Sequence, residues 1–356
     1  MQIVAVADDL SGATETLAAL SLWGAKVWLN TENPTVLLDE LQAANSFVID
    51  SNTRLMSEVD AGHKAKQIAG ILANSAKELI IFHKVDSLLR GNLAAEVEEA
   101  KVHGPVVLAV ANPETDRTTL NGVVLVRGLE MHLTDLWSSE SGQPWASIAQ
   151  SLGTASSIVV SLDSVRRGPF ELAKVLAEHA KSDSVMICDS ETDEDLDAIA
   201  AAAQQICNVQ LFGSAGLARA LARIVRPSVA STETPTNVSR EVTVIVGSNA
   251  SSSNRQVAHL DELGIKWMTF RPEHDQEASF NAAIGSSLVL TGGATARAIL
   301  ENLGVEWLRP FHEIETGMVA SSTSTSQAVV IKPGSYGDDH TLVRAVQYLM
   351  NISKQK

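Results

Sequence analysis

Short apolar runs that alternate with helical patterns are the feature that most constrains the fold of this chain. Residues 3–7, 47–50, 106–111 and 185–188 form such runs, and each ends in polar or glycine residues. Between the runs, apolar residues recur at helical spacing, as Ala13, Leu17 and Leu20 do. This alternation predicts parallel strands joined by crossover helices. We therefore expect an α/β protein with two domains, each a mostly parallel sheet flanked by helices.

The expected domain boundary follows from a change in composition at residues 227–240. This stretch is rich in Pro, Ser and Thr and lacks any apolar periodicity, which is typical of a linker. We expect an N-terminal domain at residues 1–226, a linker at 227–240 and a C-terminal domain at 241–356. A length of 356 residues fits two domains.

Charge and cysteine content exclude several classes of protein. The net charge of −15, with 27 Lys and Arg residues in total, leaves no basic face for a nucleic acid. Cys188 and Cys207 belong to no Cys-x-x-Cys pair, which argues against a zinc site or a disulfide framework. The first residues lack the pattern of a signal peptide, and no apolar run is long enough to span a membrane. We expect a cytoplasmic protein without nucleic-acid or membrane partners.

Polar side chains follow the predicted strands of the N-terminal domain at the points where the strands end. They are Asp8, Asp9, Arg54, Lys84, Asp86, Ser87, Arg90 and Asn92. The carboxyl ends of parallel strands share one edge of a sheet, so we expect these groups to converge. Arg54 and Lys84 suit a carboxylate or a phosphate, and Asp9 or Asp86 could bind sugar hydroxyls or accept a proton from one. These side chains could instead have only structural roles. Each aspartate could be a helix N-cap, and each arginine could form a surface ion pair. Ser11 is the expected N-cap of the first helix.

The C-terminal domain repeats one design, in which a strand, a glycine-containing loop and a helix follow each other. The three loops lie at residues 247–251, 291–295 and 332–337. Each places glycine where a backbone can approach a ligand, and each opens a helix whose free N–H groups attract anions. A nucleotide with its phosphates is the natural ligand, although no loop matches the common NTPase or dinucleotide motifs.

Five segments together resemble the four-carbon acid sugar kinase family. They are residues 7–13 (Ala-Asp-Asp-Leu-Ser-Gly-Ala), 84–92 (Lys-Val-Asp-Ser-Leu-Leu-Arg-Gly-Asn), 213–218 (Gly-Ser-Ala-Gly-Leu-Ala), 247–248 (Gly-Ser) and 332–337 (Lys-Pro-Gly-Ser-Tyr-Gly). The resemblance implies an N-terminal domain that binds the sugar acid and a C-terminal domain that binds ATP. It implies phosphorylation of the terminal (4-) hydroxyl of threonate, erythronate or 3-oxo-tetronate.

The resemblance also implies roles for individual residues. The sugar acid would face Asp9, Arg54, Lys84, Val85, Asp86 and Ser87, with Arg90 beside them. ATP would face Ser248, Gly292, Gly293, Ala294, Thr295 and Gly334. Arg117, Thr118 and Asn121 belong to a further family-like segment without an implied role.

We therefore predict an ATP-dependent kinase of a four-carbon sugar acid, with Mg²⁺ bridging the ATP phosphates. Either Asp9 or Asp86 would accept the hydroxyl proton, and the two domains would close over both ligands. A homo-oligomer is compatible with the sequence. One alternative is a nicotinamide-dependent oxidoreductase, against which the missing Gly-x-Gly-x-x-Gly motif counts. The other is a non-catalytic sensor that binds the sugar acid or the nucleotide. It is favoured by a short C-terminal domain and by Pro333, where the family has serine.

Overall fold

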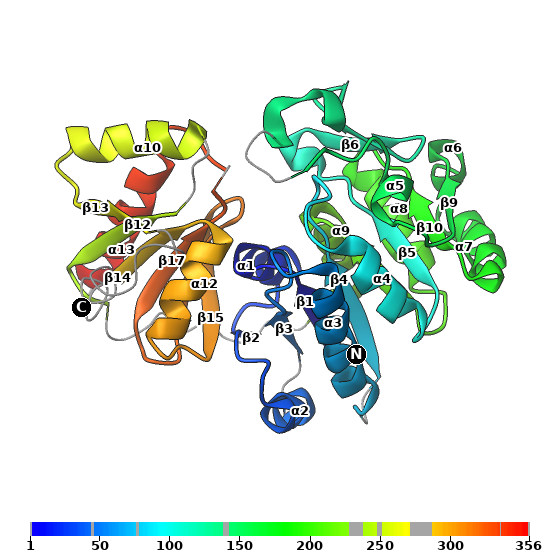
Figure 1. The fold of residues 1–356 in the computed structure, drawn as a ribbon, viewed down its shortest axis with the longest axis horizontal. Coiled ribbons are helices and arrows are strands. Elements are labelled where there is room, and N and C mark those ends of the chain that lie inside the picture. The colour runs from blue at the N-terminus through cyan, green and yellow to red at the C-terminus, as the bar shows by residue number, and fades with distance from the viewer. Residues whose placement is uncertain are drawn as a thin grey trace.

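The computed structural model describes residues 2–43, 46–75, 78–137, 142–227, 238–247, 251–270, 287–334 and 336–354. Within these ranges the chain forms two halves that lie side by side (Figure 1). Fourteen strands of the two halves form one sheet in the order β13-β12-β14-β17-β16-β15-β2-β3-β1-β4-β11-β5-β10-β9. None of the helices in these ranges has the length and hydropathy needed to cross a membrane.

The N-terminal half is an entirely parallel part of this sheet with helices on both faces. Its strands in the main sheet are β1 (Gln2–Ala7), β2 (Lys26–Trp28), β3 (Ser46–Asp50), β4 (Leu79–Lys84), β5 (Val106–Ala109), β9 (Ser157–Val160), β10 (Val185–Cys188) and β11 (Gln210–Gly213). Its helices are α1 (Leu10–Ala19), α2 (Pro34–Ala43), α3 (Glu58–Ala73), α4 (Leu93–Lys101), α5 (Ile148–Ser151), α6 (Leu162–Val165), α7 (Pro169–His179), α8 (Asp193–Ala203) and α9 (Ala215–Val225). A small antiparallel sheet of β6 (Arg117–Leu120), β7 (Val123–Val126) and β8 (Leu129–Glu130) lies beside it.

The C-terminal half continues the sheet with both parallel and antiparallel strands. Its strands are β12 (Val242–Val246), β13 (Trp267–Thr269), β14 (Ser287–Thr291), β15 (Trp307–Glu315), β16 (Met318–Thr323) and β17 (Ala328–Lys332). Its helices are α10 (Ser251–Glu262), α12 (Gly293–Asn302) and α13 (Thr341–Lys354). Strands β13, β12, β14 and β17 are parallel, whereas β15 and β16 form an antiparallel hairpin.

A short antiparallel contact between β2 and β15 joins the two halves. It pairs Trp307 with Trp28 and Leu308 with Val27. The ammonium group of Lys26 lies 5.1 Å from the centre of the Trp28 ring and 5.0 Å from that of Trp307, which suits a cation–π interaction with each. We call this contact the seam. The halves therefore share one sheet and are not connected by the chain alone.

Helix α1 lies between the halves in Figure 1. Every residue of α1 is buried, because the helix contacts α9 on one side and α12 and β15 on the other. Since α1 directly follows β1, the start of this central helix lies at the carboxyl edge of the parallel strands. That edge is where the polar residues of the N-terminal domain were expected to meet.

The α/β class with a mostly parallel sheet flanked by helices is confirmed. The prediction missed α2 and the β15–β16 hairpin, and it did not anticipate the seam. The assignment of Ser11 as N-cap was wrong, because Asp9 caps α1 and Ser11 lies inside the helix. Most of the predicted linker, residues 228–237, lies outside the described residues.

Candidate active site

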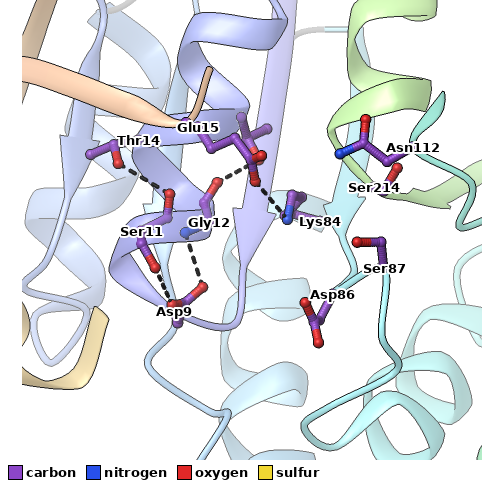
Figure 2. A network of polar contacts seen from close by, with 12 residues as sticks. Asp9, Ser11, Gly12, Thr14, Glu15, Lys84, Asp86, Ser87, Asn112 and Ser214 are labelled. Carbon is purple, nitrogen blue, oxygen red and sulfur yellow. Dashed lines mark hydrogen bonds and ion pairs between the residues drawn. The ribbon is translucent and has the colours of Figure 1, made fainter. Parts of the chain in front are cut away.

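Asp9 begins the site at the point where β1 passes into α1. Its Oδ1 accepts a hydrogen bond from the Gly12 backbone N–H at 2.9 Å, and the Ser11 hydroxyl donates to its Oδ2 at 2.6 Å (Figure 2). Extended backbone angles at Asp9 permit this cap. Asp9 is therefore a helix N-cap, which is the structural role considered for it from the sequence. Because the same carboxylate also belongs to a larger ionic network, capping does not exhaust its interactions.

Arg54 links the two aspartates that follow β1. Its guanidinium donates two hydrogen bonds of 2.7 Å to Asp8 and lies 2.9 Å from Asp9 Oδ1. Burial raises the pKa of Asp8, and the charge of Arg54 offsets this only in part. Burial would also raise the pKa of Asp9, but Arg54, the Ser11 hydroxyl and Lys84 together lower it. Asp9 is therefore ionised at neutral pH.

Lys84 ends β4 directly beside Ala7, the last residue of β1. Its ammonium group lies 3.1 Å from Glu15 Oε2, and both side chains are buried (Figure 2). The hydroxyl of Tyr336, from the other half, donates to Glu15 Oε1 at 3.4 Å. The two cations predicted to bind an anion, Arg54 and Lys84, thus lie at the site but are each paired with protein carboxylates.

The turn after β4 contains the remaining predicted sugar-site residues. Asp86 accepts three hydrogen bonds from Arg90, at 2.5 and 3.0 Å from the guanidinium and 3.2 Å from the backbone N–H. Burial would raise the pKa of Asp86, but the charge and hydrogen bonds of Arg90 lower it well below its usual range. Ser87 is buried and contacts Arg117. Val85 packs in an apolar cluster, so its side chain is part of the core.

The three glycine-containing loops follow β12, β14 and β17, which are neighbours in the sheet. Gly292, at φ 97°, is the N-cap of α12, so Gly293, Ala294 and Thr295 form the first turn of that helix. A Cβ on Gly247 would lie 1.6 Å from Thr295 Oγ1, which shows how closely the first two loops pack. The described parts of the three loops therefore lie at one edge of the sheet, whereas Ser248 lies outside the described residues.

The loop after β17 is held by buried side chains. Lys332 donates to the carbonyl oxygens of Pro333 at 2.8 Å and Gly334 at 3.2 Å, and Ser253 donates to the latter at 2.9 Å. Burial lowers the pKa of Lys332 to about 7. Gln256 on α10 donates to the carbonyl of Tyr336 at 3.1 Å. These bonds fix the loop backbone with Gly334 at its centre.

The two sets of loops meet at Gly293. A Cβ built on Gly293 would lie 2.2 Å from Asp9 Oδ2 and 2.9 Å from Ser11 Oγ. The sugar-site carboxylate is therefore in van der Waals contact with the first residue of α12. One turn later, Arg297 donates to Asp50 Oδ2 at 2.8 Å and to the Leu29 carbonyl at 2.6 Å. Helix α12 is thus attached to the N-terminal half beside the site.

Several residues at this edge were not among the predicted site residues. They are Glu15, Asp50, Arg297 and Tyr336. Glu15 carried a local signal, because it is the one charged residue in the stretch 10–22, which was predicted to form a helix. No local signal identified the Asp50–Arg297 pair, since its partners are 247 residues apart in sequence.

Comparisons with known proteins agree with this division of the site. Residues 3–221 match the family model of a sugar-binding N-terminal domain, and residues 277–342 match that of a nucleotide-binding C-terminal domain. A curated D-threonate kinase from Cupriavidus necator is 28% identical over 98% of both chains. One from Salmonella typhimurium is 27% identical, also over 98% of both. A solved structure from Haemophilus influenzae has a TM-score of 0.69 at 14% identity and covers 98% of this chain and 100% of that chain.

The fold, the two-sided site and these relatives define a sugar-acid kinase, an enzyme that transfers phosphate to an alcohol. Its two halves correspond to a sugar-binding and a nucleotide-binding family model. The chain belongs to the four-carbon acid sugar kinase family. The family and the enzyme class implied by the resemblance are confirmed, and the oxidoreductase and sensor alternatives lose their support.

Proposed function

We propose that this protein transfers the γ-phosphate of ATP to the 4-hydroxyl of a four-carbon sugar acid, with D-threonate as the first candidate. The observation that carries the proposal is the contact between Asp9 and Gly293. It brings a carboxylate of the sugar-binding half to the N-terminus of a helix in the nucleotide-binding half. Helix N-termini favour phosphate groups, so the acceptor and the transferred phosphoryl group would meet there.

Asp9 is the better candidate than Asp86 for the residue that orients the attacking hydroxyl and accepts its proton. Asp86 is fully engaged by Arg90, whereas Asp9 faces the junction where transfer would occur. The position of the Asp9 carboxylate matters more than its basicity. In the loose transition state of phosphoryl transfer, the attacking hydroxyl has lost little of its proton. Lys84 and Arg54 would keep Asp9 ionised and add positive potential beside the phosphoryl group.

The nucleotide phosphates would lie against the first turn of α12 and the backbone of Gly334. Among the described residues, no group of three or more His, Cys, Asp or Glu side chains could hold a metal ion. Mg²⁺ would then be held mainly by the substrate phosphates and waters, a mode that needs few protein ligands. Bound there, Mg²⁺ would neutralise charge on the β- and γ-phosphates.

A substrate panel tests the proposal. Purified protein is incubated with ATP, Mg²⁺ and, in turn, D-threonate, D-erythronate and 3-oxo-tetronate, and ADP release is followed by a coupled assay. We expect turnover with at least one acid, fastest with D-threonate, and turnover slower by at least about 100-fold with Asp9→Asn at the same protein concentration. Absence of ADP release with every acid, together with no thermal stabilisation by ATP, would refute the proposed function.

A further inference from the structure

Arg54, Lys84, Arg90 and Arg117 are four of the cationic side chains at the carboxyl edge of the N-terminal strands in the described part of the chain, and the first three are matched by carboxylates. The matched pairs are Arg54 with Asp8 and Asp9, Lys84 with Glu15, and Arg90 with Asp86. The fourth cation is Arg117, the first residue of β6. Within the described part of the chain it forms no ion pair, and its one side-chain hydrogen bond goes to the Ser87 hydroxyl at 2.5 Å.

Arg117 is nevertheless 7% exposed, and its Nε–H is buried without a partner among the described residues. The Tyr336 ring lies 5.9 Å from the guanidinium carbon and offsets the charge only weakly. The Asp86 carboxylate, whose pKa is lowered in part by the charge of Arg117, is hydrogen-bonded by Arg90. A buried guanidinium with unmatched donors is costly in the free protein, and an anion that arrives with a ligand would remove that cost.

The backbone holds Arg117 firmly in this position. Its N–H and C=O both bond to Asn112, which follows β5, and Asn112 is in turn held by Arg219 at 2.5 Å. The side chain then reaches back across β11 to Ser87 at the end of β4. The guanidinium is thus presented from a rigid support, as a specific anion site requires.

The position of Arg117 indicates which anion it would bind. Phosphoryl transfer would occur at Asp9, which follows β1 and contacts Gly293. Arg117 is supported by β5, three strands further along the order β1-β4-β11-β5. In Figure 2, Asp9 and Ser87 lie on opposite sides of Lys84. A four-carbon sugar acid has its carboxylate and its 4-hydroxyl at opposite ends. With the hydroxyl at Asp9, the carboxylate would point towards Ser87 and Arg117.

We propose that Arg117 and Ser87 form the carboxylate subsite of the substrate, and that Arg117 makes the enzyme prefer sugar acids over neutral polyols. This inference rests on the proposed function for the orientation of the substrate. A guanidinium fork matches a carboxylate with two parallel hydrogen bonds, and Ser87 supplies a third donor. Arg54 and Lys84 then serve the phosphoryl end, where their own carboxylate partners already place them.

The test compares D-threonate with D-threitol, in which a hydroxymethyl group replaces the carboxylate. We expect Arg117→Gln to lower kcat/KM for D-threonate by at least about 100-fold, the usual effect of removing one partner of a buried charge pair. The value for D-threitol should change by less than about threefold, the level expected for a group it does not contact. Arg117→Lys keeps the positive charge but loses the two-pronged geometry of the guanidinium. Its kcat/KM for D-threonate should therefore lie between the values of Arg117→Gln and the wild type. Arg127→Gln, an exposed arginine beside the same small sheet, is the control and should leave both values unchanged.

Thermal stabilisation by D-threonate gives a second readout that needs no turnover. It should be present in the wild type, lost in Arg117→Gln and kept in Arg127→Gln. The ligand-free melting temperature of Arg117→Gln should not fall, because the change removes an unmatched buried charge.

Equal losses on D-threonate and D-threitol would overturn the subsite and assign Arg117 to the phosphoryl group. Unchanged turnover of D-threonate in Arg117→Gln would also overturn it, while the proposed function would stand. Stabilisation by D-threonate that depends on Arg117, without any ADP release in the wild type, would support the subsite and refute the kinase proposal. Absence of D-threonate turnover and binding in the wild type would overturn the subsite.

Discussion

Asp9 serves two helices at once, which explains why its role is ambiguous in the sequence. It caps α1 through Gly12 and Ser11, and it lies against Gly293 at the start of α12. A capping aspartate can be replaced by asparagine with little loss, because both side chains accept the same backbone hydrogen bond. A carboxylate that accepts a proton cannot be replaced in this way. The two roles can therefore be separated by one substitution.

We expect Asp9→Asn to lower kcat by about 100- to 10,000-fold, the usual contribution of an acid–base group. Its melting temperature should fall less than that of Asp86→Asn, because Arg54 keeps its two hydrogen bonds to Asp8. Asp86→Asn should instead lose about 1–3 kcal/mol of stability, because Arg90 loses its charged acceptor. Its kcat should fall less than that of Asp9→Asn. Steady-state kinetics and thermal unfolding of both variants check this. A larger kcat loss in Asp86→Asn would make Asp86 the base.

Gly293 should tolerate no side chain, because a Cβ would lie 2.2 Å from Asp9 Oδ2. We expect Gly293→Ala to push the α12 N-terminus away from Asp9 and to lower kcat by about 100-fold, as displacements near 1 Å do. Gly70→Ala is the matched control, since its Cβ would meet nothing within 4 Å inside α3. That control should gain about 0.5–1 kcal/mol of stability and keep full activity. Normal kcat in Gly293→Ala would contradict the close contact.

At the scale of elements, the sequence predicted what depends on local pattern. Apolar runs such as residues 106–111 and the glycine loop at residues 291–295 carry their own signals, so strands, loops and their shared edge were predictable. The β15–β16 hairpin was not, because Pro310, His312 and Glu313 interrupt the apolar alternation of β15. Pairings such as Arg54 with Asp8 depend on side-chain directions in the folded protein, which spacing does not reveal. The sequence therefore predicted that these side chains converge but not how their charges pair.

Helix α4 contains a titrating group behind the site. Glu96 accepts a hydrogen bond from the Thr53 hydroxyl at 2.7 Å, and burial, reinforced by the charge of Asp8, raises its pKa to about 8. The folded protein therefore holds a proton on Glu96 that the unfolded chain, with a value of 4.5, releases. The contribution of Glu96 to the free energy of unfolding is therefore fully present below pH 4.5. It is lost as the pH rises through about 8.

We expect Glu96→Gln to remove that part of the pH dependence, because glutamine keeps the hydrogen-bond acceptor and cannot ionise. The free energy of unfolding of the wild type should fall relative to that of Glu96→Gln between pH 5 and pH 8. Urea unfolding at several pH values measures the difference. Glu98 is an exposed residue of the same helix. The free energy of unfolding of Glu98→Gln should therefore change with pH in parallel with that of the wild type. Parallel curves for Glu96→Gln and wild type would show that Glu96 is ionised throughout.

At the scale of the whole molecule, a buried ion pair connects the halves next to the site. Arg297 on α12 bonds to Asp50 at the end of β3, and the chain continues from Asp50 to Arg54. Movement of α12 would therefore be transmitted to the sugar-site arginine through a few residues. Removing one partner of such a pair leaves the other charge buried and unmatched, which costs about 3–5 kcal/mol.

We expect Arg297→Met to lower the free energy of unfolding by that amount and to raise KM for both substrates. The double variant Asp50→Asn with Arg297→Met should recover part of the loss, because no unmatched charge remains. Arg255→Met, which breaks an exposed pair with Asp339, should cost less than about 1 kcal/mol. Urea unfolding of the four proteins checks this. A loss in Arg297→Met no greater than in Arg255→Met would refute a coupling role.

The seam between β2 and β15 determines how the halves can move. The described strands β2 and β15 pair at two positions, Trp28 with Trp307 and Val27 with Leu308, and the backbone N–H groups of Leu29 and Asn30 also donate to the Glu306 carbonyl. A hydrogen-bonded ladder resists stretching but yields to rotation between neighbouring strands, whose twist varies widely among sheets. Any opening or closing of the halves should therefore occur as torsion about this ladder. The seam would then resist twisting elastically, and Lys26, whose ammonium group lies over the rings of both Trp28 and Trp307, would help to set the relaxed angle between the halves.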